Sequence, residues 1–353
     1  MTYCINPNCK NPHNPETSLF CCSCGSELLL KGRYQVIQIV EKRPYTAVYE
    51  VLEQGKEKIL KVLEKPYNKL VELFEQEAKV LQELAHPGIP KRYGYFKFKV
   101  KSSPELFPCL VMEKIQGVNL QKYIEHRENR PIEEELVLQW SFKLVNILDA
   151  VHEEKLFHRD IKPSNIMLKY NGELVLIDFG AVREITDTYL DSLAREKITA
   201  VFSQGYTAPE QLQGKASQQS DFFALGRTLV YLLTGDEPSC LFKNPNDKNR
   251  LLWREQASVS NQFADFIDQL MDPIPENRPK DTKTLLKKLA EIQENFLPTQ
   301  AITSDIEIPP NQRHETFKQN RRQKKFSLRR TPDNQKTFIF SPNQVVKNCF
   351  SLR

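Results

Sequence analysis

The sequence of 353 residues predicts an α+β protein in which a strand-rich region is followed by a helix-rich region. Between Tyr34 and Met112, valine, isoleucine and tyrosine recur in short runs, which is typical of β-strands. After Gly117, apolar residues recur every three or four positions, which is the period of amphipathic helices. Hydrophobic residues make up 40% and charged residues 27%, so the chain has enough apolar material for a sizeable core.

The strand-rich region is expected to contain five strands and one long helix. The strands are predicted at residues 34–40, 47–52, 58–63, 93–100 and 110–112. The helix is predicted between Val71 and Leu84, because Phe74 and the other apolar residues there lie on one face. The prolines of His86-Pro-Gly-Ile-Pro90 should end this helix.

The helix-rich region is expected to contain four long helices and one pair of strands. The helices are predicted at residues 133–152, 218–233, 261–270 and 282–295. The strands are predicted at Ile166–Lys169 and Leu174–Ile177, joined by a turn at Asn171-Gly172.

Two segments at the ends differ from this core in composition. Residues 1–29 hold five of the eight cysteines and are too short to bury a core without a stabilising link. Residues 298–353 are polar and aperiodic, and we expect them to be disordered when alone. They contain eleven Lys or Arg against four Asp or Glu, so the tail carries the basic excess of a chain with formal net charge +5.

The sequence lacks the patterns of membrane insertion and export. It contains no run of about 18 apolar residues, so we expect no transmembrane helix. It does not start with a basic stretch followed by an apolar one, so we expect no signal peptide and a cytoplasmic protein. In a reducing cytosol, clustered cysteines favour a metal site over disulfides.

Three short motifs follow one another in the helix-rich region. His158-Arg-Asp-Ile-Lys-Pro-Ser-Asn165 precedes the predicted strand pair, Asp178-Phe-Gly180 follows it, and Ala208-Pro-Glu210 comes about thirty residues later. In this order and spacing they resemble the eukaryotic-like protein kinases, and the resemblance covers roughly residues 34–296.

This resemblance implies a bilobal protein-kinase fold, with a β-rich N-lobe at residues 34–115 and an α-helical C-lobe at residues 116–297. Lys61, in the third predicted strand, would hold the α- and β-phosphates of ATP. Its partner would be Glu77 rather than Glu75, because Glu77 lies on the apolar face of the predicted helix.

The resemblance also implies the side chains that would act in phosphoryl transfer. Asp160 would accept the proton of the substrate hydroxyl, and Lys162 would offset charge on the transferring phosphoryl group. Asn165 and Asp178 are oxygen donors of the kind that Mg²⁺ prefers, and Mn²⁺ could take its place. The cofactors implied are therefore ATP and a divalent cation, and the substrates are proteins.

Further positions of the resemblance would bind the adenine of ATP. Met112 would lie behind the adenine, and the backbone from Glu113 to Ile115 would form the hinge that hydrogen-bonds to it. The side chains implied to contact the ring are Val40, Val48 and Leu168.

Other residues match positions that stabilise the active site or regulate the enzyme in members of this family. Asp221 would hold the catalytic loop, and Arg278 would pair with Glu210. Arg159 precedes the catalytic Asp, which usually accompanies control by phosphorylation of the activation segment, here residues 181–207. The candidate acceptors are Thr199, which is favoured by its position, and Thr186, Thr188 and Ser192.

The nucleotide loop departs from the family pattern. Glu41, Arg43 and Thr46 stand where the family has three glycines, and Ile59 replaces a small residue two positions before the Lys. Side chains there should hinder the loop from folding tightly over the phosphates, although Arg43 could offset the charge of Glu41. The alternative to an active kinase is therefore a pseudokinase scaffold with a degenerate loop.

The cysteines near the start of the chain have the spacing of a zinc-ribbon-like module. Cys4 and Cys9 form one pair, and Cys21 and Cys24 form a knuckle before a turn glycine. Cys22 is a rival for Cys21, which we prefer for its knuckle spacing. Zn²⁺ is the predicted ligand, and a redox-active thiol cluster is the alternative. With the kinase motifs, this arrangement resembles the four-cysteine serine/threonine kinases of cyanobacteria.

The tail offers two further hypotheses. The basic run Arg321–Arg330 could contact nucleic acid or an acidic membrane surface, or direct self-phosphorylation to Ser327 or Thr331. A solvated extension without a role is the alternative. As a whole, the sequence predicts a non-specific serine/threonine protein kinase that transfers the ATP γ-phosphate to protein hydroxyls in regulatory signalling, with autophosphorylation.

Overall fold

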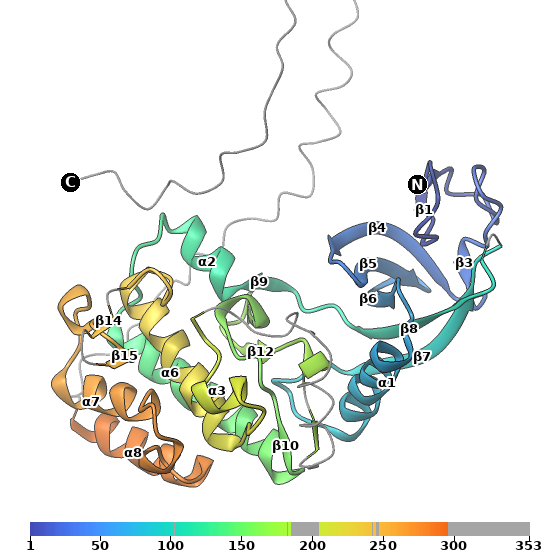
Figure 1. Cartoon of the computed structure of the whole chain (residues 1–353). Helices are drawn as coiled ribbons and strands as arrows, with labels where there is room; N and C mark the ends of the chain where they lie inside the picture. Colours follow the sequence, from blue (N-terminus) through green and yellow to red (C-terminus); the bar gives the residue numbers. More distant parts are fainter. Residues whose placement is uncertain (102, 182, 185–204, 242, 245–246, 296–353) are drawn as a thin grey trace, which may run out of the picture. The chain divides into compact units, whose positions relative to one another are not determined.

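The computed structural model describes residues 1–101, 103–181, 183–184, 205–241, 243–244 and 247–295 (Figure 1). Over these residues a strand-rich N-lobe precedes a helical C-lobe, as predicted. The tail lies outside the described residues. So do residues 185–204, which include all four candidate phosphorylation sites of the activation segment. Within the described part of the chain, no helix combines the length and the apolar character needed to cross a membrane.

The N-lobe is built on a six-stranded antiparallel sheet with the strand order β3-β4-β5-β6-β8-β7. Its strands are β3 (Leu29–Leu30), β4 (Tyr34–Lys42), β5 (Thr46–Glu53), β6 (Lys56–Leu63), β7 (Arg92–Lys99) and β8 (Leu106–Glu113). The five long strands were all predicted from their β-branched runs, and only their ends differ. The structure therefore confirms the predicted β-rich N-lobe.

Cross-strand register decides which side chains share a face of this sheet. Val48 pairs with Lys61, and Ile59 pairs with Met112. Residues directly opposite each other in an antiparallel pair point to the same side. Leu60 and the other alternate positions therefore point to the opposite side, where they form a buried core. This core comprises, among others, Val36, Tyr49, Val51, Leu60, Val62 and Val111.

The helix α1 (Asn68–Glu83) is the long N-lobe helix predicted from apolar spacing. Phe74, Ala78 and Leu81 are buried on one face, and Glu77 is buried among them. The helix ends at Glu83, and its C-cap residue Leu84 has an extended backbone shortly before the His86-Pro87 turn. A carboxylate that is buried on the apolar face of a helix requires a cationic partner.

The C-lobe is formed mainly by helices. They are α2 (Leu120–His126), α3 (Glu134–Glu153), α5 (Pro209–Leu212), α6 (Gln218–Thr234), α7 (Asn261–Leu270) and α8 (Thr282–Asn295). Helix α6 is buried along almost its whole length, and α3 packs against both α6 and α8 (Figure 1). A capping box at Ser217 begins α6 and the left-handed Gly235 ends it, so both ends have satisfied backbone groups.

A small sheet in the C-lobe carries the segment between the first two motifs. Its order is β12-β11-β9, with β9 (Gly117–Asn119), β11 (Ile166–Lys169) and β12 (Leu174–Leu176). Gly117 approaches the next strand so closely that a Cβ atom there would lie 2.0 Å from the Leu168 carbonyl oxygen. Only glycine permits this approach of the two backbones.

The cysteine-rich start of the chain packs onto the N-lobe sheet. Its strands β1 (Thr2–Tyr3) and β2 (His13–Asn14) pair with each other, while β3 extends the large sheet. The Thr2 hydroxyl donates to the Val36 carbonyl oxygen at 2.9 Å, and the rings of Tyr3 and Tyr49 lie 5.8 Å apart. Ile5 is part of the same apolar core as the sheet. The module therefore covers the sheet face that points away from Lys61.

Short elements were missed by the sequence analysis. They are β1, β2, β3, β9, α2, α5, β10 (Leu156–Phe157), β13 (Arg183–Glu184), β14 (Lys243–Asn244) and β15 (Asp247–Leu251). Most of these segments have two to four residues. Such segments are too short to show a period, and tertiary contacts decide their conformation.

Candidate active site

A buried ion pair joins the sheet to helix α1. Lys61 Nζ lies 2.8 Å from Glu77 Oε1 and 2.9 Å from Oε2, so the lysine holds both carboxylate oxygens. Lys61 Nζ also lies 2.8 Å from Asp178 Oδ1. Gly180 fits against this group, since a Cβ atom there would be 3.2 Å from Glu77 Oε2. The structure thus brings together Lys61, Glu77 and Asp178, and Glu75 pairs with Lys97 instead.

The environment of Asp178 keeps it ionised. Burial acts to raise the pKa of this carboxyl, but the positive charges of Lys61 and Arg43 outweigh burial and hold the pKa well below its ordinary value. Its backbone has φ +65°, in the left-handed region that residues other than glycine seldom adopt. Such a conformation persists where the surrounding structure holds the residue in place, and the side chain of Asp178 is held by both cations.

The catalytic loop brings Asp160, Lys162 and Asn165 together. Asn165 Nδ2 donates to Asp160 Oδ2 at 2.8 Å and to the Asp160 carbonyl oxygen at 2.9 Å. Lys162 Nζ lies 2.8 Å from the same Asp160 Oδ2. These contacts fix the carboxylate in one orientation and leave the Asn165 amide oxygen as an acceptor.

Asp221 anchors this loop from helix α6, as predicted. Its carboxylate accepts hydrogen bonds from the backbone N–H groups of His158 at 2.9 Å and Arg159 at 2.7 Å, and lies 2.8 Å from His152 Nε2. Asp221 is 0% exposed, so its charge is compensated entirely by these partners. The loop is therefore held by backbone contacts that do not depend on its side chains.

The predicted pair of Glu210 and Arg278 is also present. Arg278 donates from Nη1 to Glu210 Oε1 at 2.7 Å and from Nη2 to Oε2 at 3.0 Å. The Ser220 hydroxyl donates to Glu210 Oε1 at 2.6 Å. Burial acts to raise the pKa of Glu210, but Arg278 and Ser220 outweigh it, so the pKa lies below its ordinary value.

The hairpin between β4 and β5 closes without any glycine. Arg43 N donates to the Thr46 carbonyl oxygen at 2.8 Å, which leaves Pro44 and Tyr45 as the turn. Residues 41–46 are all described, and none of them has a positive φ. The backbone of this hairpin therefore does not require glycine. Arg43 pairs with Glu41, with Nε 2.7 Å from Oε1, which is the charge compensation expected from the sequence.

Of the three side chains expected to contact the adenine, one has to be corrected. Val40 is 57% exposed and Val48 is partly buried, so both are accessible. Leu168 is 0% exposed, and a side chain without exposed surface cannot contact a ligand. Side chains alternate along a strand, and the preceding Met167 is partly exposed. Met167, which the sequence analysis missed by one position, therefore replaces Leu168 in the expected set.

Comparison with known proteins agrees with this geometry. The chain matches the family model of the protein kinase domain over residues 34–290. The chain belongs to the protein kinase family. The predicted family and bilobal fold are therefore confirmed.

Several curated relatives of this kinase-family chain are named serine/threonine-protein kinases. Serine/threonine-protein kinase B of Synechocystis sp. is 32% identical over 305 residues, which are 82% of this chain and 52% of the relative. Kinase F of the same organism is 32% identical over 76% of this chain and 57% of its own length. Kinase PknA of Nostoc sp. is 31% identical over 74% of this chain and 48% of its own length. The chain thus spans about half the length of the curated relatives it matches.

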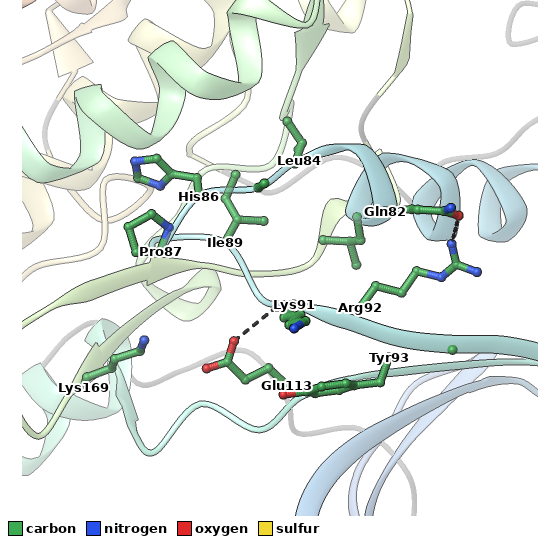
Figure 2. Close-up of a pocket in the computed structure, with 13 residues that line it drawn as sticks. Gln82, Leu84, His86, Pro87, Ile89, Lys91, Arg92, Tyr93, Glu113 and Lys169 are labelled. Carbon is green, nitrogen blue, oxygen red and sulfur yellow. Dashed lines mark hydrogen bonds between the residues drawn. The ribbon is translucent and has the colours of Figure 1, made fainter.

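A cavity lies outside the catalytic group of this kinase-family chain. Its volume is about 740 Å³, and its walls come from the end of α1, the loop that follows, the start of β7, Glu113 and Lys169 (Figure 2). Glu113 Oε2 accepts from the Lys91 backbone N–H at 3.2 Å, and Arg92 donates to Gln82. Glu113, from the predicted hinge, is one of its walls, but none of the residues that hold Asp160 or Asp178 lines it, so it lies outside the catalytic group.

The four cysteines chosen from the sequence lie together. One sulfur from each of Cys4, Cys9, Cys21 and Cys24 falls within 4.8 Å of all the others. The sulfurs of Cys4 and Cys24 are 3.6 Å apart, and so are those of Cys9 and Cys21. Cys22 is exposed and is not part of the group. The cluster therefore offers four sulfur ligands, as a metal site requires.

The electrostatics of this cluster favour at least one thiolate. Burial acts to raise the pKa of Cys24, but hydrogen bonds with the Ser26 hydroxyl and backbone outweigh burial and lower it to about 6. Burial raises the pKa of the neighbouring Cys4 thiol above its ordinary value. A bound cation would lower both, because a coordinating thiol is deprotonated.

Proposed function

We propose that this chain is an active serine/threonine protein kinase, which transfers the γ-phosphate of ATP to hydroxyl groups of proteins. One observation carries the proposal: the ionic group of Lys61, Glu77 and Asp178 and the hydrogen-bonded pair of Asp160 and Asn165 are both present, which are the groups that phosphoryl transfer requires. The names of the relatives support the same activity.

The residues present fit ATP and a divalent cation. Asp178 Oδ atoms and the Asn165 amide oxygen are the hard donors that Mg²⁺ or Mn²⁺ takes, and Lys61 supplies a cation for the α- and β-phosphates. Such a metal ion, when bound, offsets the charge of the phosphates. The Glu113 and Ile115 backbone would bind the adenine edge. The side chains assigned to its faces are Val40, Val48 and Met167, and Met112 would lie behind it.

Asp160 is the group that orients the substrate hydroxyl and accepts its proton. Its carboxylate is held by Asn165 and Lys162, so it needs little reorganisation when the hydroxyl arrives. Lys162 lies beside it and can turn its charge toward the transferring phosphoryl group. Proteins with accessible serine or threonine are therefore the proposed substrates.

A pseudokinase scaffold is the competing function, and the glycine-free hairpin is the observation that favours it. The hairpin nevertheless closes, and no ionic group of the site is lost. Since electrostatic stabilisation is the largest contribution to this chemistry, we favour the active enzyme.

Incubation of the purified chain with γ-labelled ATP, Mg²⁺ or Mn²⁺ and a generic protein acceptor tests the proposal. We expect label on the acceptor or on the chain itself, and about a thousandfold less with Asp160→Asn, since a positioned base contributes roughly 10²–10⁴. Nucleotide binding should persist in that variant. A folded wild-type protein that binds ATP but transfers no label with either metal would instead be the pseudokinase.

The cysteine cluster is proposed to hold structural Zn²⁺. With Zn–S bonds of about 2.3 Å, tetrahedral geometry requires sulfurs about 3.8 Å apart. The separation of 3.6 Å in two of the pairs is close to this value. Four sulfur ligands leave no open position, so the site would stabilise the module and not take part in the transfer.

Regulation through Arg159 is proposed from its burial. Its Nε atom is buried and has no hydrogen-bond partner in the described part of the chain. Burial also lowers the pKa of Arg159, since the charged form is less well solvated there. A phosphorylated activation-segment residue, with Thr199 as first choice, would satisfy it. The cytoplasmic location and the contacts of the basic tail stay predictions from sequence.

A further inference from the structure

The hairpin of the N-lobe reaches the metal-binding carboxylate through one side chain. Arg43 Nη1 lies 2.6 Å from Asp178 Oδ2, although the two residues are 135 positions apart in the chain. The other edge of the guanidinium donates to Glu41, with Nε 2.7 Å from Oε1 and Nη2 3.2 Å from Oε2. The guanidinium thus lies between the hairpin and the floor of the site.

Both oxygens of Asp178 are occupied in this arrangement. Lys61 holds Oδ1 and Arg43 holds Oδ2. The kinase reaction requires Asp178 to bind a divalent cation, and a cation beside a guanidinium on one carboxylate would suffer like-charge repulsion. Arg43 therefore has to leave Asp178 when the metal–nucleotide complex binds.

The hairpin has few backbone donors to offer a phosphate. The N–H of Arg43 is already bonded to Thr46, and Pro44 has no N–H. The strands on either side pair Lys42 with Ala47 and Glu41 with Val48. In a glycine-rich loop, backbone N–H groups near these positions face the phosphates, so this chain needs another donor.

We propose that Arg43 binds the phosphates of the nucleotide in place of the glycine-loop amides, and exchanges Asp178 for them when the nucleotide binds. The proposal rests on the proposed kinase function. A guanidinium offers paired N–H donors that match two phosphate oxygens, so it can replace several backbone contacts. Glu41 stays bound to the guanidinium and keeps it directed into the site.

Titration calorimetry with two ligands tests this proposal. ATP with Mg²⁺ reports the phosphate contacts, and adenosine reports the adenine site alone. We expect Arg43→Ala to weaken ATP binding about tenfold, the loss typical of a charged hydrogen bond, and to leave adenosine binding unchanged. Arg43→Lys should recover part of the loss, because it keeps the charge without the paired donors.

Lys42→Ala is the matched control. It removes the same charge from the same hairpin, but Lys42 Nζ pairs with Glu64 Oε2 at 3.4 Å and not with Asp178. Its ATP affinity should stay within about twofold of wild type. If Arg43→Ala binds ATP as tightly as wild type or more tightly, Arg43 only occupies Asp178 and makes no contact with the phosphates, and the proposal is overturned. A wild type that binds no ATP would refute the proposed function itself.

Discussion

The catalytic loop and the nucleotide hairpin form two walls of one site, and they are held in opposite ways. The catalytic loop is held by Asp221, which is 0% exposed and accepts two hydrogen bonds from the backbone of the loop. The hairpin tip depends on Arg43 and Glu41, whose side chains are 42% and 48% exposed. The catalytic loop is fixed by a buried charge, and the tip of the hairpin by an ion pair that is exposed to solvent.

This difference explains why one wall matches the family pattern and the other does not. A buried carboxylate such as Asp221 cannot be replaced without leaving backbone donors unsatisfied. A solvated hairpin can exchange glycines for charged side chains at little cost in stability, provided that its turn needs no positive φ. The hairpin without glycines still closes, and under the proposal above it differs from the family in how it binds phosphates.

The largest expected effect is on the buried wall. Asp221→Asn replaces a charged acceptor by an amide that has to present N–H groups to other donors, and should lower the free energy of unfolding by about 3 kcal/mol. Urea denaturation measures it. Asp236→Asn, at an exposed position directly after α6, is the control for removal of an aspartate from the C-lobe. A loss below about 1 kcal/mol for Asp221→Asn would break the comparison, because the loop would then be held by other contacts.

The second prediction concerns another buried charge of the C-lobe, the carboxylate of Glu210, and the pH dependence of the stability that it provides. The folded pKa of Glu210 lies below its ordinary value of 4.5, so its pairing with Arg278 stabilises the fold above that pH and is lost as the pH falls through the folded pKa. Glu210→Gln should therefore be about 2 kcal/mol less stable than wild type at pH 7, and the gap should narrow as the pH falls below 4.5 and through the lower folded pKa. Thermal denaturation across this range measures it, and a gap that is constant with pH would contradict the assignment.

The third effect concerns the covered face of the sheet beneath the hairpin. If the cysteine cluster holds Zn²⁺, its removal by a chelator or by Cys4→Ser should loosen Ile5 and Thr2 from the sheet and lower the melting temperature by about 3 °C. Cys22→Ser is the matched control, since Cys22 is exposed and outside the cluster. Equal melting of all these proteins, with metal content measured by atomic absorption, would show that the module is held without a metal.

The smallest effect is expected on the exposed wall. Arg43→Ala should lower the free energy of unfolding by about 1 kcal/mol or less, because its pair with Glu41 is exposed and Asp178 keeps its pair with Lys61. Measured on the protein used for the ATP titrations, this would separate a binding role from a structural one. A loss above about 2 kcal/mol would mean that the hairpin is a structural support like the catalytic loop.

Much of the fold and of the site could be predicted because the information is local or carried by spacing. Helices α7 and α8 have the predicted ends, since their apolar period is uninterrupted. The order of residues in the motif is enough to identify Asp160 and its partner Asn165. The position of Glu77 on the buried face of helix α1 identifies it as the partner of Lys61. Each of these conclusions needs only the neighbouring sequence.

The rest depended on contacts between distant segments. The adenine contact was predicted at Leu168, which has no exposed surface, whereas the neighbouring Met167 is partly exposed. Pairing with β9 and β12 sets which strand face is exposed, and the segment alone does not show it. The docking of the first residues on Val36 and Tyr49 has no signal in a two-residue strand. The contact of Arg43 with Asp178 joins two lobes and could not be derived from either segment alone.

The shared core of the module and the sheet has a consequence for where the catalytic unit begins. The family match starts at residue 34, yet Ile5 and Leu30 belong to the same apolar cluster as Val36 and Val51. A protein truncated to the matched residues would present that cluster to water, and exposed apolar surface of this kind promotes aggregation. The smallest soluble form of this kinase domain should therefore include the cysteines, whatever else they sense or bind.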